Sequence, residues 1–122
     1  MVTQSKAAYN RGDILLVSYP FTDFTQKKLR PALVLSNNAF NSQNGDIVCA
    51  CITSQSKSGP YTVSIRSTDS EFAQTMLKTD SVILTSKIMT VDARVIHRRL
   101  GSLKANRLQQ VSGQIKKLLE TK

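Results

Sequence analysis

Residues 47–53 form the apolar segment that most constrains how this chain can fold. Alternate side chains of an extended strand point to opposite faces of its sheet. Here both sets are apolar: Ile47, Cys49 and Cys51 on one face, and Val48, Ala50 and Ile52 on the other. Such a pattern is typical of a central strand covered on both sides. The segment therefore predicts a sheet with this strand near its middle, buried on both faces.

Several other short segments have the composition of strands. We predict them at residues 14–19, 32–35, 61–65, 81–84 and 87–91, with an edge strand at 95–100. Polar connections are expected at residues 21–29, 37–45 and 54–60. Residues 69–78 are expected to form a short helix or an irregular turn, with Asp69 or Ser70 as its N-cap.

The end of the chain predicts one long helix. Gly101 is expected to break the chain and Ser102 to cap a helix over residues 103–119. Its apolar residues recur at helical spacing and are expected to pack on the sheet: Leu108, Val111, Ile115, Leu118 and Leu119. Strands and helices do not alternate along the chain, which disfavours a parallel, doubly wound sheet. The pattern favours a mainly β protein, a small antiparallel β-barrel with a C-terminal helix.

The chain is strongly basic. It has 122 residues and a net charge of +9, and residues 94–122 carry eight basic residues and one acidic residue, which is +7 of that total. This length predicts one domain over residues 11–122 after a loose lead-in at 1–10. The charge favours nucleic acid, an anionic surface or an acidic protein as the partner. A solvated helix face remains the alternative.

Other features concern the compartment. Residues 1–9 lack the apolar core of a signal peptide. No segment approaches the roughly 20 apolar residues of a membrane span, so no membrane association is expected. Cys49 and Cys51 are expected to be reduced packing residues, which is typical of a cytoplasmic protein.

Several kinds of site are absent from the sequence. There is neither a glycine-rich phosphate loop nor an HExxH motif. The acidic residues are scattered, and His97 is the only histidine, so we expect no metal site and no cofactor.

Arg30 and Thr53 remain as candidates. Each lies at the end of a predicted strand beside a polar loop, so the two could converge on one phosphate if the strands are neighbours. A guanidinium and a hydroxyl suffice for RNA cleavage in which the 2′-OH attacks its own neighbouring phosphate, because the protein then needs only to align the backbone and neutralise developing charge. From spacing alone, a surface cation and an ordinary strand threonine remain the alternatives.

An ordered series of motifs resembles the MazF/PemK family of toxin endoribonucleases. The series comprises Arg11-Gly12-Asp13-Ile14, Arg30 to Leu35, Ile52 to Gln55, Lys78 to Val82 and Thr90-Val91-Asp92. The resemblance covers about residues 11–119. It implies an SH3-like barrel with a C-terminal helix and a homodimer. It also implies metal-independent, sequence-specific cleavage of single-stranded RNA, which leaves a 2′,3′-cyclic phosphate and a 5′-OH.

The resemblance also implies roles for individual residues. Arg30 would stabilise the phosphate, and Thr53 would donate a hydrogen bond to the transition state. The expected RNA-binding residues are Phe21, Phe24, Lys27, Lys28, Gln55 and Lys57. Phe21 or Phe24 could stack on an unpaired base, although either could instead anchor its loop to the core.

Partners follow from the same resemblance. An acidic antitoxin would cover the basic groove, and the toxin–antitoxin complex could bind operator DNA through the antitoxin. The chain departs from the family at Ser86 to Met89, where an acidic residue followed by Gln-Ile-Arg is common. Two alternatives stay open: a CcdB-like toxin that binds a protein such as DNA gyrase without cutting RNA, and a degenerate member that only binds RNA.

Overall fold

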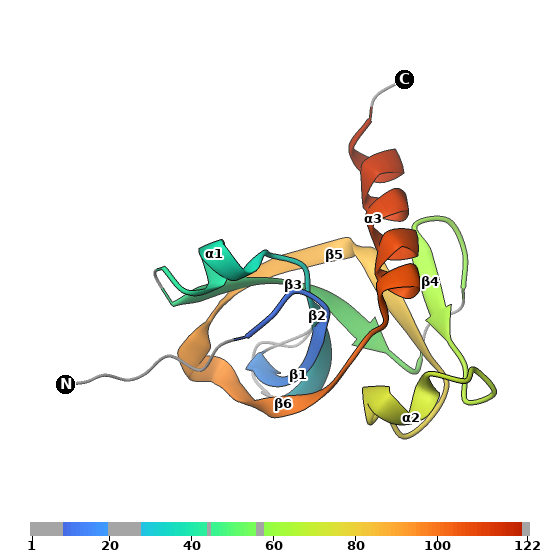
Figure 1. Cartoon of the computed structure of the whole chain (residues 1–122), viewed down its shortest axis with the longest axis horizontal. Coiled ribbons are helices and arrows are strands. Elements are labelled where there is room, and N and C mark those ends of the chain that lie inside the picture. Colours follow the sequence, from blue (N-terminus) through green and yellow to red (C-terminus); the bar gives the residue numbers. More distant parts are fainter. Residues whose placement is uncertain (1–8, 20–27, 44, 56–57, 121–122) are drawn as a thin grey trace.

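Antiparallel strands form one curled sheet, shown in Figure 1. The computed structural model describes residues 9–19, 28–43, 45–55 and 58–120. In these ranges the strands are β1 (Asp13–Tyr19), β2 (Lys28–Val34), β3 (Asp46–Thr53), β4 (Thr62–Ile65), β5 (Ser81–Asp92) and β6 (Ile96–Ser102). The helices are α1 (Asn38–Asn41), α2 (Phe72–Thr75), α3 (Ala105–Leu119) and the 3-10 turn η1 (Ala93–Val95). The strand order is β4-β5-β3-β2-β1-β6.

Both faces of β3 are buried, as its sequence predicts. Ala50 and Ile52 belong to a helix-side core, which α3 and α2 help to close. Ile47, Cys49 and Cys51 belong to a second core on the opposite face. Burial raises the pKa of the Cys49 thiol to about 12, with a smaller contribution from Cys51. The thiol is therefore protonated and serves as an apolar packing group.

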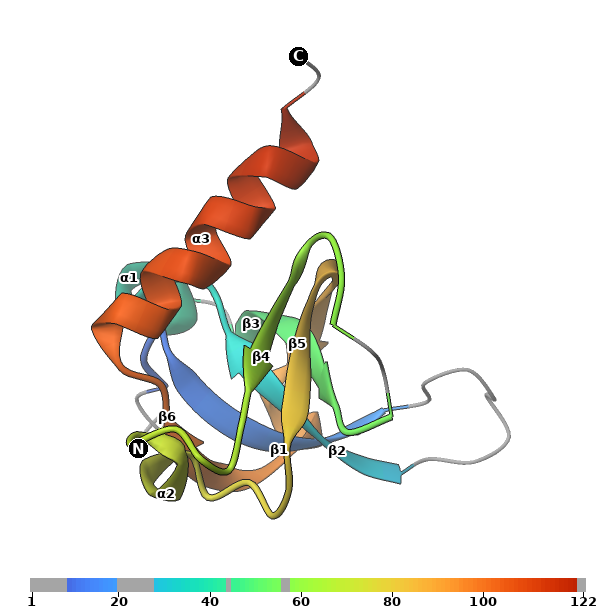
Figure 2. The ribbon, with the colours of Figure 1, turned by 90° about the vertical axis from the view of Figure 1, so that its right-hand side faces the viewer.

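The sheet curls but does not close into the predicted barrel. Within the described ranges, β4 pairs only with β5 and β6 only with β1, so these edges do not pair with each other. The connection from β4 to β5 forms α2, which packs against β6 beside this open edge (Figure 2). Gly101 lies inside β6 instead of breaking the chain. The position requires glycine because a Cβ there would overlap the backbone of Gln74 and Thr75.

The strands at 81–84 and 87–91 are one strand, β5. Its register against β3 shifts, since Ala50 is opposite Ile88 but the next residue, Cys51, is opposite Leu84. Residues 85–87, which lie between the two predicted strands, therefore fall outside this register and form a bulge within β5. Strand β2 begins at Lys28, earlier than predicted, because residues 28–31 pair with β1.

Helix α3 begins at Ala105, two residues later than predicted. Leu103 is buried in extended backbone, where its N–H donates to the Gly12 carbonyl, and Lys104, not Ser102, is the N-cap. Leu108, Val111 and Ile115 pack on the helix-side core as expected. Leu119 is 70% exposed, so the predicted stripe does not stay buried to the end of the helix. Figure 2 shows the C-terminal half of α3 extending beyond the sheet.

The remaining differences are local. Neither Asp69 nor Ser70 is the N-cap of α2; Glu71 is, without a side-chain hydrogen bond. Tyr61 has a φ of 62° and precedes β4 instead of lying in it. Residues 1–8 of the predicted lead-in lie outside the described residues, whereas Tyr9 packs against the second core. No helix in the described part of the chain is long and apolar enough to cross a membrane.

Candidate active site

Strands β2 and β3 bring Arg30 and Thr53 to the same end of the sheet. In their antiparallel ladder, Ala32 is opposite Cys51 and Val34 is opposite Cys49. Two further steps of this register place Arg30 opposite Thr53. Side chains in opposite positions share one face of a sheet. Arg30 and Thr53 therefore lie on the same side, although they are distant in sequence.

Pairing between the two strands stops just before these residues. The ladder ends at Ala32 and Cys51, and Pro31, which has no N–H to donate, follows on β2. Residues 28–31 of β2 continue to pair with β1 on their other side. The start of β2 is thus held in the sheet by β1, but Arg30 and Thr53 are not joined to each other by ladder hydrogen bonds.

A cavity of about 680 Å³ opens at this point and includes both residues in its lining. We call it the strand-end cavity. Its other described lining residues come from β1, β2, β3, β6 and the segment from α2 to β5: Leu16, Leu29, Pro31, Ile52, Ser54, Ala73, Met76, Leu77, Lys78, Thr79, Ser81, Arg98 and Leu100. This volume lies in the range of sites for small ligands, so the cavity can hold a nucleotide-sized group.

The Thr53 hydroxyl is positioned to donate. Its Oγ1 accepts a hydrogen bond of 3.0 Å from the backbone N–H of Gln55. A hydroxyl also carries a proton and a second lone pair. Because the N–H holds the oxygen, the hydroxyl proton remains available for an acceptor such as a phosphate oxygen.

The strand-end cavity is cationic. Arg30, Lys78 and Arg98 line it, and its described lining residues include no carboxylate. Arg30 is half-buried, and its Nε is shielded from solvent, so its charge acts in a less polar medium than a surface cation does. Arg30 and Thr53 share a face with Ala32 and Cys51, whereas Ile52 in the same lining faces the helix-side core, so the cavity lies around the end of the sheet and not on one face. This end of the sheet offers a phosphodiester permanent positive charge and a hydroxyl donor.

The other predicted RNA-binding residues do not all reach this cavity. Lys28 is exposed at the start of β2, and Gln55 is exposed after β3; neither belongs to the lining. Gln55 instead contributes the N–H that holds Thr53. The other four lie outside the described residues: Phe21, Phe24, Lys27 and Lys57.

The basic C-terminal segment contributes little to the strand-end cavity apart from Arg98. Arg94 pairs with Asp92 at 3.0 Å, and Arg99 pairs with Asp13 at 3.0 Å. The charge of this segment is therefore partly neutralised by neighbouring acids rather than gathered into one patch.

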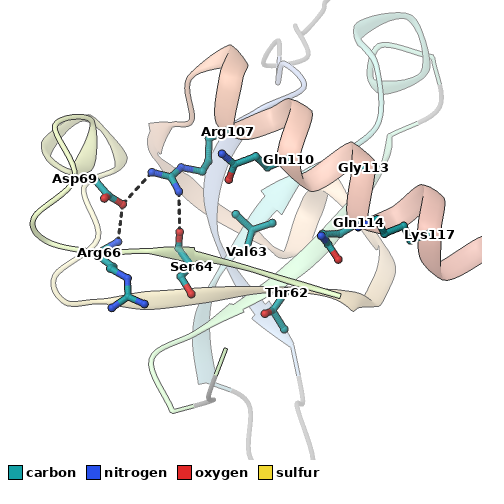
Figure 3. Close-up of a pocket in the computed structure, with 10 residues that line it drawn as sticks. All are labelled: Thr62, Val63, Ser64, Arg66, Asp69, Arg107, Gln110, Gly113, Gln114 and Lys117. Atoms are coloured by element: carbon teal, nitrogen blue, oxygen red, sulfur yellow. Dashed lines mark hydrogen bonds and ion pairs between the residues drawn. The ribbon is translucent and has the colours of Figure 1, made fainter. Parts of the chain in front are cut away.

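A second hollow, of about 440 Å³, lies between β4 and α3 (Figure 3). We call it the helix groove. Arg107 lies in it and donates to Glu71 Oε2 at 2.7 Å, Asp69 Oδ2 at 3.0 Å and the Ser64 carbonyl at 3.2 Å. These contacts join α3 to β4 and to the start of α2. The guanidinium is thus used for structure, since two carboxylates compensate its charge.

Sequence reasoning missed Lys78, Met76 and Arg98 as members of the site. Lys78 lies within one of the matching motifs, whereas Arg98 lies in the expected edge strand at 95–100, where nothing in the sequence marks it as part of a site. Met76 carried no sequence signal, because a methionine is not a typical residue for the left-handed C-cap that ends α2 here. These residues are distant in sequence, and only the folded structure brings the segment after α2 and strand β6 together beside the start of β2.

The departure from the family pattern lies away from the strand-end cavity. Ser86, Lys87 and Ile88 are exposed on β5, and Met89 packs against the second core.

Among the described residues, no group of three His, Cys, Asp or Glu side chains is arranged to hold a metal ion.

Known structures share this fold. MazF from Deinococcus radiodurans is 25% identical, with a TM-score of 0.74 over 93% of this chain and 98% of that chain. The MazE–MazF complex from Deinococcus radiodurans is 24% identical, with a TM-score of 0.76 over 96% of this chain and 100% of that chain. An endoribonuclease in complex with its cognate antitoxin, from a mycobacterial species, is 19% identical, with a TM-score of 0.75 over 94% of this chain and 98% of that chain.

No curated protein is significantly similar to the chain in sequence. A family model nevertheless matches residues 10–119, nearly the whole of the described structure. The chain therefore belongs to the PemK-like, MazF-like toxins of type II toxin–antitoxin systems.

Proposed function

We propose that this toxin is a metal-independent, sequence-specific endoribonuclease that cleaves single-stranded mRNA in the strand-end cavity. The observation that carries the proposal is the convergence of Arg30 and Thr53, from two strands, on one cationic cavity. The family match and the related structures described as endoribonucleases support the same activity.

The RNA supplies the nucleophile. Its 2′-oxygen loses a proton and bonds to the adjacent phosphorus, while the bond from phosphorus to the 5′-oxygen breaks. The leaving oxygen gains a proton, so the products carry a 2′,3′-cyclic phosphate and a 5′-OH. The protein then has to align the backbone and stabilise charge on the phosphoryl oxygens.

Arg30 and Thr53 match these needs. The guanidinium stays protonated and presents a planar fork of donors to phosphate oxygens. The Thr53 hydroxyl, held by the Gln55 N–H, donates to a second oxygen as negative charge develops. Removing one such donor from an enzyme commonly costs about 10²–10³ in rate.

Partners follow from the same site. Because the described lining is cationic, an antitoxin with an acidic segment would block it by charge complementarity. The related endoribonuclease in complex with its cognate antitoxin provides a precedent for an antitoxin as the partner. We further propose that the toxin acts as a homodimer in the cytoplasm, and that operator DNA is bound through the antitoxin.

Cleavage of a mixed-sequence single-stranded RNA by the wild-type protein, Arg30→Ala and Thr53→Ala tests the proposal. We expect each substitution to reduce cleavage at least about 10²-fold while the circular dichroism spectrum is unchanged. We also expect EDTA to leave the rate unaltered and the new ends to be 5′-OH. Full activity of Arg30→Ala would refute the assignment, and RNA binding without product would indicate a non-cleaving protein.

A further inference from the structure

The strand-end cavity extends well beyond Arg30 and Thr53. On β1, Leu16 is opposite Pro31 of β2 and opposite Arg98 of β6. All three residues line the cavity, so its floor crosses the sheet as far as the β6 edge. Ala73, Met76, Leu77 and Lys78, from α2 and the segment after it, form the facing wall. This far part is a second lobe that the cleavage chemistry itself does not require.

The second lobe exposes apolar side chains. Met76 is 63% exposed and Leu29 is 46% exposed, and both line the cavity. Met76 also has a φ of 60°, in the left-handed region that a non-glycine residue seldom adopts. The backbone of Met76 ends α2 as its C-cap, where its N–H donates to the Ala73 carbonyl. The exposed apolar side chain takes no part in that cap, so its position in the cavity wall suggests contact with a ligand.

The same lobe carries two cations. Lys78 and Arg98 are exposed, and neither side chain forms a hydrogen bond or ion pair within the part of the chain that the structure describes. The apolar wall and these cations together match a nucleotide, which has a flat base with apolar faces and a charged phosphate. The helix groove is a poorer candidate, because Asp69 and Glu71 already compensate Arg107 there.

We propose that this second lobe binds the nucleotide adjoining the cleaved linkage, with its phosphate on Arg98 and Lys78 and its base against Met76 and Leu29. The proposal rests on the proposed ribonuclease function. The RNA sequence is then selected by the segment after α2 and by β6 as well as by the loops beside the strand ends. Met76 and Leu29 contact the base, while Arg98 and Lys78 contribute electrostatic affinity.

Two substitutions separate binding from folding. Met76→Asn removes the apolar contact and places a residue that tolerates the left-handed conformation, so stability should be unchanged or higher. Arg98→Gln removes one cation from the lobe. Arg94→Gln is the matched control, because it removes an arginine that is close in sequence and lies outside the cavity lining.

The readouts are cleavage-site sequencing of total RNA and kinetics on a fluorogenic RNA that carries the mapped sequence. Arg98→Gln should raise KM about tenfold, leave kcat nearly unchanged, and reduce the slope of log affinity against log salt by about 0.7. Met76→Asn should alter the base preference at one position beside the cleaved linkage while keeping the salt slope. Arg94→Gln should behave as the wild type.

The outcomes are distinct. If the wild type cleaves RNA but Met76→Asn and Arg98→Gln match the control in KM, salt slope and sequence preference, the second lobe is not a nucleotide subsite. If both variants keep those values but bind the antitoxin more weakly, the lobe serves the antitoxin and the proposal is likewise overturned. If the wild-type protein does not cleave RNA at all, the ribonuclease assignment fails, and this inference fails with it.

Discussion

Substitution of Arg107 tests how helix α3 is held to the sheet. Its guanidinium contacts Glu71 at 2.7 Å and Asp69 at 3.0 Å, and the Glu71 side chain is only 6% exposed. In Arg107→Ala, Glu71 would remain buried without its cation. Breaking a buried ion pair costs about 3–5 kcal/mol. Because the Arg107 side chain is itself 20% exposed, we expect the lower end of this range, about 3 kcal/mol.

Urea denaturation followed by circular dichroism measures this loss. For a chain of this size, a loss of about 3 kcal/mol corresponds to a fall in Tm of about 10 °C. Arg94→Ala is the control, because its partner Asp92 lies in solvent and the pair is expected to contribute little. The double variant Arg107→Met with Glu71→Gln should recover much of the stability, since no buried charge is then left unpaired.

The interpretation of Arg107 would be wrong if Arg107→Ala unfolded at the same urea concentration as Arg94→Ala. It would also be wrong if Glu71→Gln failed to soften the effect of Arg107→Ala. The first result would mean that solvent reaches Glu71 freely. The second would mean that Arg107 stabilises α3 by packing its aliphatic chain instead of by pairing.

Two further predictions concern packing. Gly101→Ala should lower stability by about 1–3 kcal/mol, since an added methyl would lie 2.7 Å from the Thr75 carbonyl carbon, and a Tm unchanged from the wild type would contradict the close approach of α2 and β6. Because the pKa of Cys49 is raised from 9.0 to about 12, the unfolded chain releases this proton at lower pH than the folded chain, so stability should fall as pH rises from 9 towards 12. Comparing urea midpoints of the wild type and Cys49→Ala at about pH 8 and about pH 10.5 tests this, and an equal decline in both would exclude Cys49 as a cause.

Much of the sheet could be predicted because strand signals are local. The apolar pattern of residues 47–53 located β3 and its two buried faces, and spacing located the buried stripe of α3. The continuity of β5 could not be predicted, because Ser86 and Lys87 interrupt the pattern. A register irregularity against β3 depends on the partner strand, not on local composition.

The candidate site divides in the same way. Arg30 and Thr53 could be nominated from strand ends and family motifs, and the fold places both in the lining of one cavity. Met76 and Arg98 could not be nominated, since they come from α2 and β6, whose meeting depends on Gly101 and on the packing of the open edge. Glu71 is the N-cap of α2, where Asp69 or Ser70 was predicted. The Asp69 carboxylate accepts instead from the Arg107 guanidinium and from the backbone N–H of Arg66.

The register between β2 and β3 has a consequence for how such toxins can vary. The connection cannot vary along its whole length, because the N–H of Leu35 donates to the Val48 carbonyl and Asn41 is buried. Residues can be gained or lost after Asn41 without disturbing the alignment of Arg30 with Thr53, since the ladder between β2 and β3 fixes that alignment. A single insertion inside either strand, between Ala32 and Arg30 or between Cys51 and Thr53, would turn one of the two side chains to the opposite face. Homologues that cut RNA this way should therefore differ in length at the connection and hardly ever inside these few strand positions.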